Sequence, residues 1–291
     1  MTLDPASVLR LNMAQWQGGD NPAYRTGGRI LSALLPDPLG PVETIEIPIA
    51  TGDKRSKTNG IVSRDALVNL MTSAKAAIAR HQPAGIVTVG GDCLVDLAPI
   101  AYLNDRYADD LAVLWVDAHP DVMSAKVFEN AHAHVLAMLM GEGDAAFVAS
   151  VPRKVKPQDI LYVGLSETTP FETDFIDSHG IASLRPEDLA VSAQPVLDWA
   201  RASGKKRIAI HFDLDVLDPA LYDFLLFNDP DATPDAFDGV AKGRMTMDQI
   251  QAILQAVGSE LEVVGLAITE YLPWSVIKLA KQLRLLPLLA V

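Results

Sequence analysis

The stretch RIAIHFDLDVLDP, residues 207–219, joins an apolar run directly to a series of carboxylates. A run of this length that is rich in β-branched residues is typical of a buried strand in a parallel sheet. Side chains two residues apart lie on the same face of a strand. We therefore expect Asp213 and Asp215 to lie on one face, at the point where this strand ends.

The stretch LAVLWVDAHPD, residues 111–121, has the same form, and the spacing predicts one shared face for Asp117, His119 and Asp121. Four carboxylates and an imidazole then stand at the ends of two buried strands, where unpaired charge is costly. A bound cation would remove that cost, and this ligand set suits a hard or borderline divalent ion such as Mn²⁺. The alternative is a group of buried acids that hold no ion.

Short apolar runs alternate with longer helical segments along the chain. The predicted strands cover residues 43–49, 85–89, 111–117, 160–164, 207–213 and 262–268. The predicted helices cover residues 63–80, 96–108, 131–140, 186–202 and 246–257, with Ser63 and Thr246 as N-caps. This alternation predicts an α/β fold with a mostly parallel sheet covered by helices on both faces. Since no linker divides the chain, we expect one domain over residues 1–291.

Two further segments have predicted roles. Residues 220–244 form a long irregular stretch rich in Asp, Pro and Gly, directly after a ligand-bearing strand. Because ligands bind beyond the carboxyl ends of strands in such sheets, we expect this loop to line the mouth of a site. Residues 274–291 are apolar but are interrupted by charges and are too short to span a bilayer. They are predicted to form a docking helix.

Composition excludes several classes of partner. The chain has 291 residues, of which 49% are hydrophobic and 21% charged, and a formal net charge of −13. This acidity argues against a nucleic-acid partner and against an anionic membrane surface. Cys93 is the only cysteine, so no internal disulfide is expected. A lone cysteine and an N-terminal segment without a signal-peptide pattern favour a cytoplasmic location.

Four motifs follow predicted strands in a fixed order: GGDC at 90–93, DAHPD at 117–121, DLD at 213–215 and TE at 269–270. Together they resemble the arginase/agmatinase family of ureohydrolases, whose motifs are G-G-D-H, D-A-H-x-D, S-x-D-x-D-x-x-D-P and a later Glu. The resemblance runs from about residue 85 to residue 273. It implies a three-layer α/β/α sandwich with a central, mostly parallel sheet. It also implies a homo-oligomer, either trimer or hexamer, and two Mn²⁺ ions that act on a guanidinium or related amidine group.

The resemblance assigns metal ligands position by position. Asp117 and Asp213 would bridge the two ions. His119 and Asp215 would complete one of them, and Asp121 would bind the other.

The sequence departs from the family at Cys93, which stands where the family has the His of G-G-D-H. A thiolate binds metal but prefers ions softer than Mn²⁺. The first ion is then held weakly, or a different divalent metal is used, or that subsite is empty; otherwise Cys93 is a small buried apolar residue. His211 stands where the family has Ser, and we expect it to donate a hydrogen bond to a ligand carboxylate. Direct ligation by His211 instead of Cys93 is the alternative.

The resemblance also assigns catalytic and substrate residues. Glu270 would hold the cationic substrate, the alternative being a surface or N-capping Glu. His132 matches a downstream His that resembles a proton shuttle to the leaving amine, a role that suits its pKa; a structural His is the alternative. Glu172 keeps one acidic position of the family's head-group site. Thr169 stands where an Asp would contact an α-amino group.

The predicted function is a metal-dependent hydrolase of linear amidines, specifically a ureohydrolase that cleaves a guanidino compound to urea and an amine through metal-bound hydroxide. Its predicted cofactor is one or two Mn²⁺ ions, with another divalent metal left open. One alternative is a catalytically weak binding or assembly subunit with an incomplete metal site, which the Cys93 substitution supports. Another is a zinc deacetylase of similar fold, but such sites use an adjacent His pair that this sequence lacks.

Overall fold

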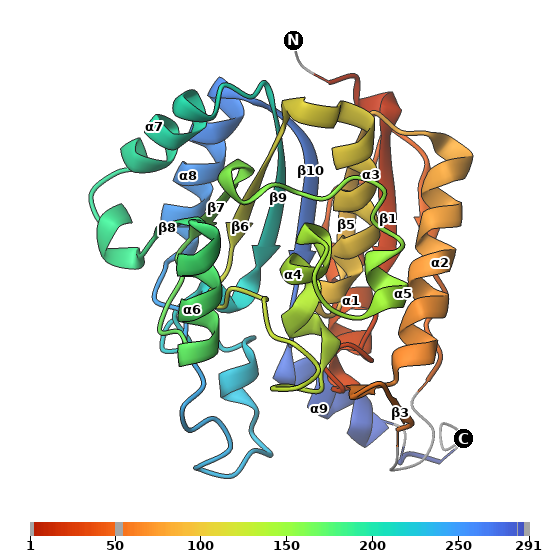
Figure 1. Ribbon diagram of the computed structural model, residues 1–291. Coiled ribbons are helices and arrows are strands. Elements are labelled where there is room, and N and C mark those ends of the chain that lie inside the picture. The colour runs from red at the N-terminus through yellow and green to blue at the C-terminus, as the bar shows by residue number, and fades with distance from the viewer. Residues whose placement is uncertain (1–2, 50–54, 284, 288–291) are drawn as a thin grey trace.

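An eight-stranded sheet runs through the centre of this computed structural model, with helices on both sides of it (Figure 1). The structure describes residues 3–49, 55–283 and 285–287. The strand order is β2-β1-β5-β10-β9-β6-β7-β8, and every neighbouring pair is parallel. The strands are β1 (Val8–Met13), β2 (Val42–Thr44), β5 (Gly85–Gly90), β6 (Leu111–Val116), β7 (Ile160–Val163), β8 (Ala182–Leu184), β9 (Arg207–Asp213) and β10 (Glu262–Thr269). A short antiparallel pair, β3 (Lys57–Thr58) and β4 (Ile61–Val62), stands apart from this sheet.

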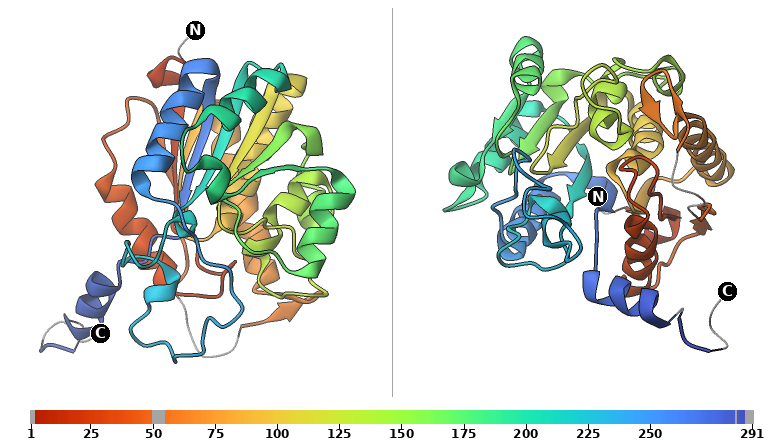
Figure 2. Two further views of the ribbon diagram at one scale, coloured as in Figure 1. Left: turned by 90° about the vertical axis from the view of Figure 1, so that its left-hand side faces the viewer. Right: turned by 90° about the horizontal axis from the view of Figure 1, so that it is seen from below.

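Helices cover both faces of the sheet, which confirms the predicted fold class. They are α1 (Ala23–Leu34), α2 (Arg64–His81), α3 (Leu97–Tyr107), α4 (Val135–Met140), α5 (Ala145–Val148), α6 (Pro170–His179), α7 (Gln194–Ser203), α8 (Met247–Glu260) and α9 (Trp274–Leu283). Seen from below, the sheet separates α2 from α8 (Figure 2). Residues of β6 alternate between the two cores: Val113 and Trp115 pack with α2 to α4, whereas Ala112 and Leu114 pack with α7 and α8. A strand buried on both faces explains the continuous apolar run.

Five of the six predicted strands are confirmed to within one residue at each end. The prediction for residues 43–49 was wrong beyond Thr44, where β2, an edge strand paired only with β1, ends. Strand β1 was not predicted. Its apolar residues alternate with Arg10 and Asn12, so it lacks the continuous apolar run that marks the central strands.

The helix predictions need several corrections. Residues 131–140 begin with a 3-10 turn, Ala131–His134, and are α-helical only in α4. Residues 186–202 form a 3-10 turn, Pro186–Leu189, followed separately by α7. Ser63 does not cap α2 with its side chain and has a φ of +55°, whereas Thr246 forms the predicted cap with Gln249. Helix α9 ends at Leu283, and residues 285–287 form a turn, consistent with the restriction that Pro287 places on the residue before it. Residues 284 and 288–291 of the predicted docking helix lie outside the described residues.

The carboxyl ends of β5, β10, β9 and β6 lie side by side in the middle of the sheet. The irregular segment that follows β9, coloured cyan, extends beyond these ends (Figure 1). Within the described ranges, no helix is both long and apolar enough to cross a membrane.

Candidate metal centre

Four neighbouring strands lead into chemically active side chains at one edge of the sheet. In sheet order, β5, β10, β9 and β6 bring Cys93, Glu270, Asp213 and Asp117 to this edge. Each of these side chains is at most 4% exposed. Because the carboxyl ends of parallel strands share one edge, residues far apart in the sequence meet here.

His119 joins two of the predicted ligands. Its Nδ1 lies 3.1 Å from Asp215 Oδ2 and 3.5 Å from Asp117 Oδ1. Its Nε2 donates to the carbonyl of Ala241 at 3.1 Å, so the loop 220–244 orients the ring from the opposite side. A His whose far nitrogen donates to a carbonyl presents its other nitrogen to a cation, as metal-binding histidines commonly do.

Cys93 lies against a second group of carboxylates. Its thiol donates to Asp213 Oδ2 at 2.7 Å, and its Sγ lies 3.6 Å from Glu270 Oε1. Burial, reinforced by these two carboxylates, raises the pKa of the Cys93 thiol well above its ordinary value. Without a cation the residue is therefore a neutral thiol, and only a bound metal makes it a thiolate ligand.

Residues 117–121 leave the sheet before their side chains converge. Strand β6 ends at Val116, so the prediction that Asp117, His119 and Asp121 share a face of one strand was wrong. Instead, Asp117 Oδ1 accepts a hydrogen bond from the His119 backbone N–H at 2.7 Å, and Asp121 has a φ of +52°. A left-handed conformation is costly outside glycine and concentrates at functional sites. The turn at Asp121 returns its carboxylate to the cluster.

The cluster holds more buried negative charge than its own imidazole can neutralise. Burial, followed by the charge of neighbouring carboxylates, raises the pKa of Asp121, Asp213 and Glu270 well above their ordinary values. Burial alone would lower the pKa of His119, but the carboxylates around it, led by Asp215, raise that pKa well above its ordinary value. Both kinds of shift are what an electrostatically negative, water-poor site produces.

The geometry fits divalent ions. Within the cluster, three buried atoms make no hydrogen bond to any described residue: Asp121 Oδ2, Asp215 Oδ1 and His211 Nε2. Buried polar atoms are normally hydrogen-bonded, so three unpaired atoms in one cluster indicate a missing ligand. The groups whose ligand atoms all lie within 4.8 Å of one another are Cys93–Asp117–Asp121–His211, Cys93–Asp213–Glu270 and Asp117–His119–Asp215.

These pKa shifts predict how stability depends on pH after metal removal. An acid whose folded-state pKa is raised, such as Asp121 or Asp213, costs stability as the pH rises from about 4 through the raised value. His119, whose pKa is also raised, stabilises when protonated and loses that contribution as the pH rises. We therefore expect the increase in Tm caused by added Mn²⁺ to grow between about pH 5 and pH 8. Thermal scans with chelator and with Mn²⁺ at each pH test this, and a pH-independent increase contradicts it.

Glu270 is held by one contact that the sequence did not reveal. The hydroxyl of Tyr24, in α1, donates to Glu270 Oε2 at 2.7 Å. Glu270 has a φ of +63°, and its N–H donates to the carbonyl of Gly91 at 2.7 Å. The carboxylate is thus fixed inside the site and is neither a surface Glu nor a helix cap.

His132 stands in the wall of the site. Its Nδ1 donates to the carbonyl of Gly18 at 3.0 Å, and burial lowers the pKa of its ring to about 4. Gly18 is fixed by Asp92, whose carboxylate accepts the Gly18 N–H at 2.8 Å. A Cβ at position 18 would lie 2.5 Å from Asp92 Oδ1, so this approach requires glycine. At neutral pH His132 is therefore neutral, and its pKa lies below the near-neutral value that the sequence-based expectation of a proton shuttle assumed.

A cavity of about 490 Å³ opens onto these side chains. Its wall includes Thr169 and Glu172, the predicted substrate residues. The two form a capping box at the start of α6: Thr169 N–H donates to Glu172 Oε2 at 2.7 Å, and Glu172 N–H donates to Thr169 Oγ1 at 3.4 Å. Much of their hydrogen-bonding capacity is thus already used by the helix. Other lining residues include the apolar side chains Met123, Phe128, Leu226, Phe237 and Val240.

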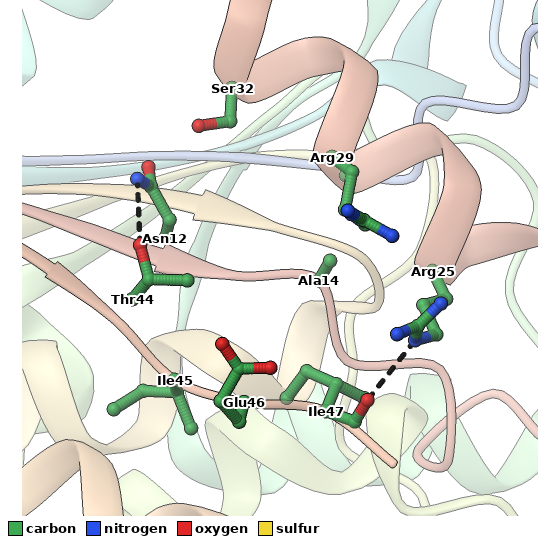
Figure 3. Close-up of a pocket in the computed structure, with 10 residues that line it drawn as sticks. Asn12, Ala14, Arg25, Arg29, Ser32, Thr44, Ile45, Glu46 and Ile47 are labelled. Atoms are coloured by element: carbon green, nitrogen blue, oxygen red, sulfur yellow. Dashed lines mark hydrogen bonds between the residues drawn. The ribbon is translucent and has the colours of Figure 1, made fainter. Parts of the chain in front are cut away.

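A second cavity, of about 240 Å³, lies between α1 and the β1–β2 edge and shares no lining residue with the first. Arg29 and Glu46 extend into it from opposite sides, and Arg25 is tied to the carbonyl of Ile47 at 3.1 Å (Figure 3). Its charged lining residues are two arginines and one glutamate, and it contains none of the predicted site residues.

Comparison with known proteins agrees with this arrangement. A family model described as "Arginase family" matches residues 41–223, more than half of the 291 residues. The chain belongs to the arginase family. The arginase of Eremothecium gossypii is 27% identical over 197 residues, which cover 64% of this chain and 46% of that enzyme. An arginase of Staphylococcus aureus is 22% identical over 185 residues, covering 60% of this chain and 61% of that enzyme.

The chain thus spans less than two thirds of the length of these family members. The structural similarity covers a larger share of the chain than the sequence similarity does. The crystal structure of Entamoeba histolytica arginase, described as a complex with L-ornithine, superposes with a TM-score of 0.77 at 22% sequence identity. The superposed residues make up 94% of this chain and 93% of the Entamoeba enzyme's chain. This similarity establishes the arginase-like fold.

Sequence reasoning missed two residues of the site. Tyr24 lies in a helix that was not predicted, and only its distance from Glu270 in space reveals its role. Asp96 was placed at the start of a helix, yet its carboxylate lies 3.2 Å from Nδ1 of His211. The sequence signal for Asp96 was an acidic residue three positions after the GGDC motif.

Proposed function

We propose that this arginase-family chain is a metal-dependent hydrolase of linear amidines that cleaves a guanidino compound to urea and an amine. The proposal rests on one observation above all: predicted metal ligands and Glu270 line one cavity and form closely spaced groups of donors. Asp117, His119, Asp121, Asp213, Asp215 and Cys93 would hold the ions. Divalent ions bound there supply Lewis acidity and a hydrolytic nucleophile from water at neutral pH.

The chain's own residues perform the remaining tasks in this proposal. Glu270 holds the guanidinium cation, and Tyr24 keeps its carboxylate in place. His132, neutral and fixed through Gly18, accepts a proton at Nε2 and delivers it to the leaving amine. The apolar wall of the cavity excludes water and packs against the substrate's tail.

The cofactor, assembly and location follow as further proposals. Carboxylate-rich ligands favour Mn²⁺ for the ion at His119. We propose one domain over the whole chain, since the sheet uses residues 8–269, together with a trimer or hexamer and a cytoplasmic location. Metal analysis, size-exclusion chromatography with light scattering, and cell fractionation test these points.

Arginine is expected to be a poor substrate. In the described part of the chain, neither Lys nor Arg lines the cavity, so an α-carboxylate finds no guanidinium or ammonium partner there. Arg244 pairs with Glu187 instead, and Lys242 Nζ lies 5.5 Å from the Phe227 ring centroid. A head group left unpaired costs orders of magnitude, so we expect kcat/KM for agmatine to exceed that for arginine by about 100-fold or more.

Urea and ammonia release from agmatine, guanidinobutyrate, guanidinopropionate and arginine, with metal content measured on the same samples, tests both the function and this preference. A Val240→Lys variant, matched by Val240→Leu, places a cation on the cavity wall and should favour the carboxylated compounds. The substrate inference is wrong if arginine has the highest kcat/KM. Metal-loaded protein that releases nothing from any linear amidine supports instead the binding or assembly subunit, for which the Cys93 substitution is the argument.

A further inference from the structure

His211 has one ring nitrogen with no partner. The side chain is completely buried, and its Nε2 makes no hydrogen bond to any described residue. The nearest carboxylate oxygen on that side, Asp117 Oδ2, lies 3.9 Å away, which is too far for a hydrogen bond. Among the described residues, His211 therefore does not make the hydrogen bond to a metal-ligand carboxylate that the sequence analysis expected.

The rest of the His211 ring is held in place by Asp96 and Trp115. Nδ1 lies 3.2 Å from Asp96 Oδ2, and the ring stacks on Trp115 with centroids 3.8 Å apart and planes 12° apart. A carboxylate next to Nδ1 favours the tautomer with the proton on that nitrogen. Nε2 then carries a lone pair aimed into the cluster, which is the arrangement of a metal-binding His with a carboxylate behind it.

The lone pair points into a group of donors of the right size. One ligand atom from each of Cys93, Asp117, Asp121 and His211 lies within 4.8 Å of the other three. Donors that share one ion at about 2.0–2.3 Å lie roughly 3–4 Å apart. The group needs only small movements to close on a single ion.

We propose that His211 replaces the imidazole missing at position 93 and, with Cys93, Asp117 and Asp121, forms one of the two ion subsites. The inference rests on the metal-dependent function proposed above and deepens it. A thiolate and an imidazole beside two carboxylates prefer a borderline ion, so this subsite takes Zn²⁺ in preference to Mn²⁺, while the His119 subsite keeps the harder set. Asp96 is a positioning residue, because it contacts His211 and not the ion.

Cobalt spectroscopy of the full chain tests the subsite without relying on activity. Protein stripped with chelator and reloaded with Co²⁺ should bind two ions and show near-ultraviolet thiolate-to-cobalt absorption. Cys93→Ser should abolish this absorption. Asp96→Asn should weaken the absorbing site by about 10- to 100-fold, as loss of a supporting carboxylate does, and His211→Ala should weaken it by about 100-fold or more. His119→Ala is the matched control, since it should remove one ion and leave the thiolate absorption.

The unmodified protein provides a second measurement that does not depend on the folding of any variant. One equivalent of Zn²⁺ should resist displacement by excess Mn²⁺, and the other should exchange. The proposal is overturned if two bound Co²⁺ ions give no thiolate absorption, if His211→Ala keeps parental affinity, or if Mn²⁺ displaces both ions equally. It is also overturned if the only bound ion is the one lost with His119. Hydrolysis is assayed separately, so inactive protein with the thiolate band contradicts only the proposed function.

Discussion

Asp213→Asn is expected to remove bound metal and abolish amidine hydrolysis. Asp213 ends β9 and its Oδ2 accepts the Cys93 thiol at 2.7 Å, so it stands between the two candidate subsites. Losing a shared ligand should weaken both ions by more than the roughly 100-fold that loss of a supporting group causes. Metal at 1,000 times its Kd stabilises the native state by about 4 kcal/mol, and the variant should lose this increment.

The same variant should be more stable than the parent when both are metal-free. Asparagine keeps the oxygen that accepts the Asp215 N–H at 2.7 Å but removes one buried carboxylate whose pKa is raised. Asp218→Asn is the matched control, because Asp218 belongs to the same motif but caps the Ala220 N–H at 2.8 Å. Elemental analysis and thermal scans with and without chelator decide the matter. Full metal content in Asp213→Asn would contradict the site.

Glu270→Gln is expected to lower kcat/KM for guanidino substrates by about 100-fold or more while metal content stays at the parental level. The carboxylate is buried within the cavity, and truncating one partner of a buried charge pair costs about 2–5 kcal/mol. Gln preserves the side chain's size and can still accept from Tyr24. Steady-state kinetics on metal-analysed samples measure the effect.

Tyr24→Phe is the companion variant, expected to lower kcat/KM by about 10-fold, because it removes only the hydrogen bond that holds the carboxylate. If Glu270→Gln loses metal, Glu270 is an ion ligand and not a substrate-binding residue, as its place in the Cys93–Asp213–Glu270 group allows. An unchanged kcat/KM would exclude it from substrate binding.

The central sheet could be predicted from the sequence because its strands are buried on both faces. Continuous apolar runs such as residues 111–116 have no other stable place in a chain of this kind. The strands and helices near the sheet's edges were harder to predict. In β1 the buried residues alternate with Arg10 and Asn12, and α6, which Thr169 and Glu172 cap, was not among the predicted helices.

The site could be predicted only where motifs follow strands. The positions of Asp213 and Asp117 could be predicted from the strands that precede them. Tyr24 and Asp96 act through contacts between segments distant in the sequence, and periodicity contains no information about such contacts. The left-handed turn at Asp121 was equally hidden, since no glycine marks it.

Strand β10 is the last strand along the described chain, yet it lies between β5 and β9 in the sheet. During synthesis the segments on either side emerge first, and each has an unpaired inner edge until residues 262–269 arrive. Such edges invite association with other chains. Cys93 belongs to one half and Asp213 to the other, so the two come together only when β10 has joined the halves. The subsite that contains Cys93 is therefore completed only after residues 262–269 have emerged, whereas the Asp117–His119–Asp215 group lies entirely in the half that contains β6 and β9.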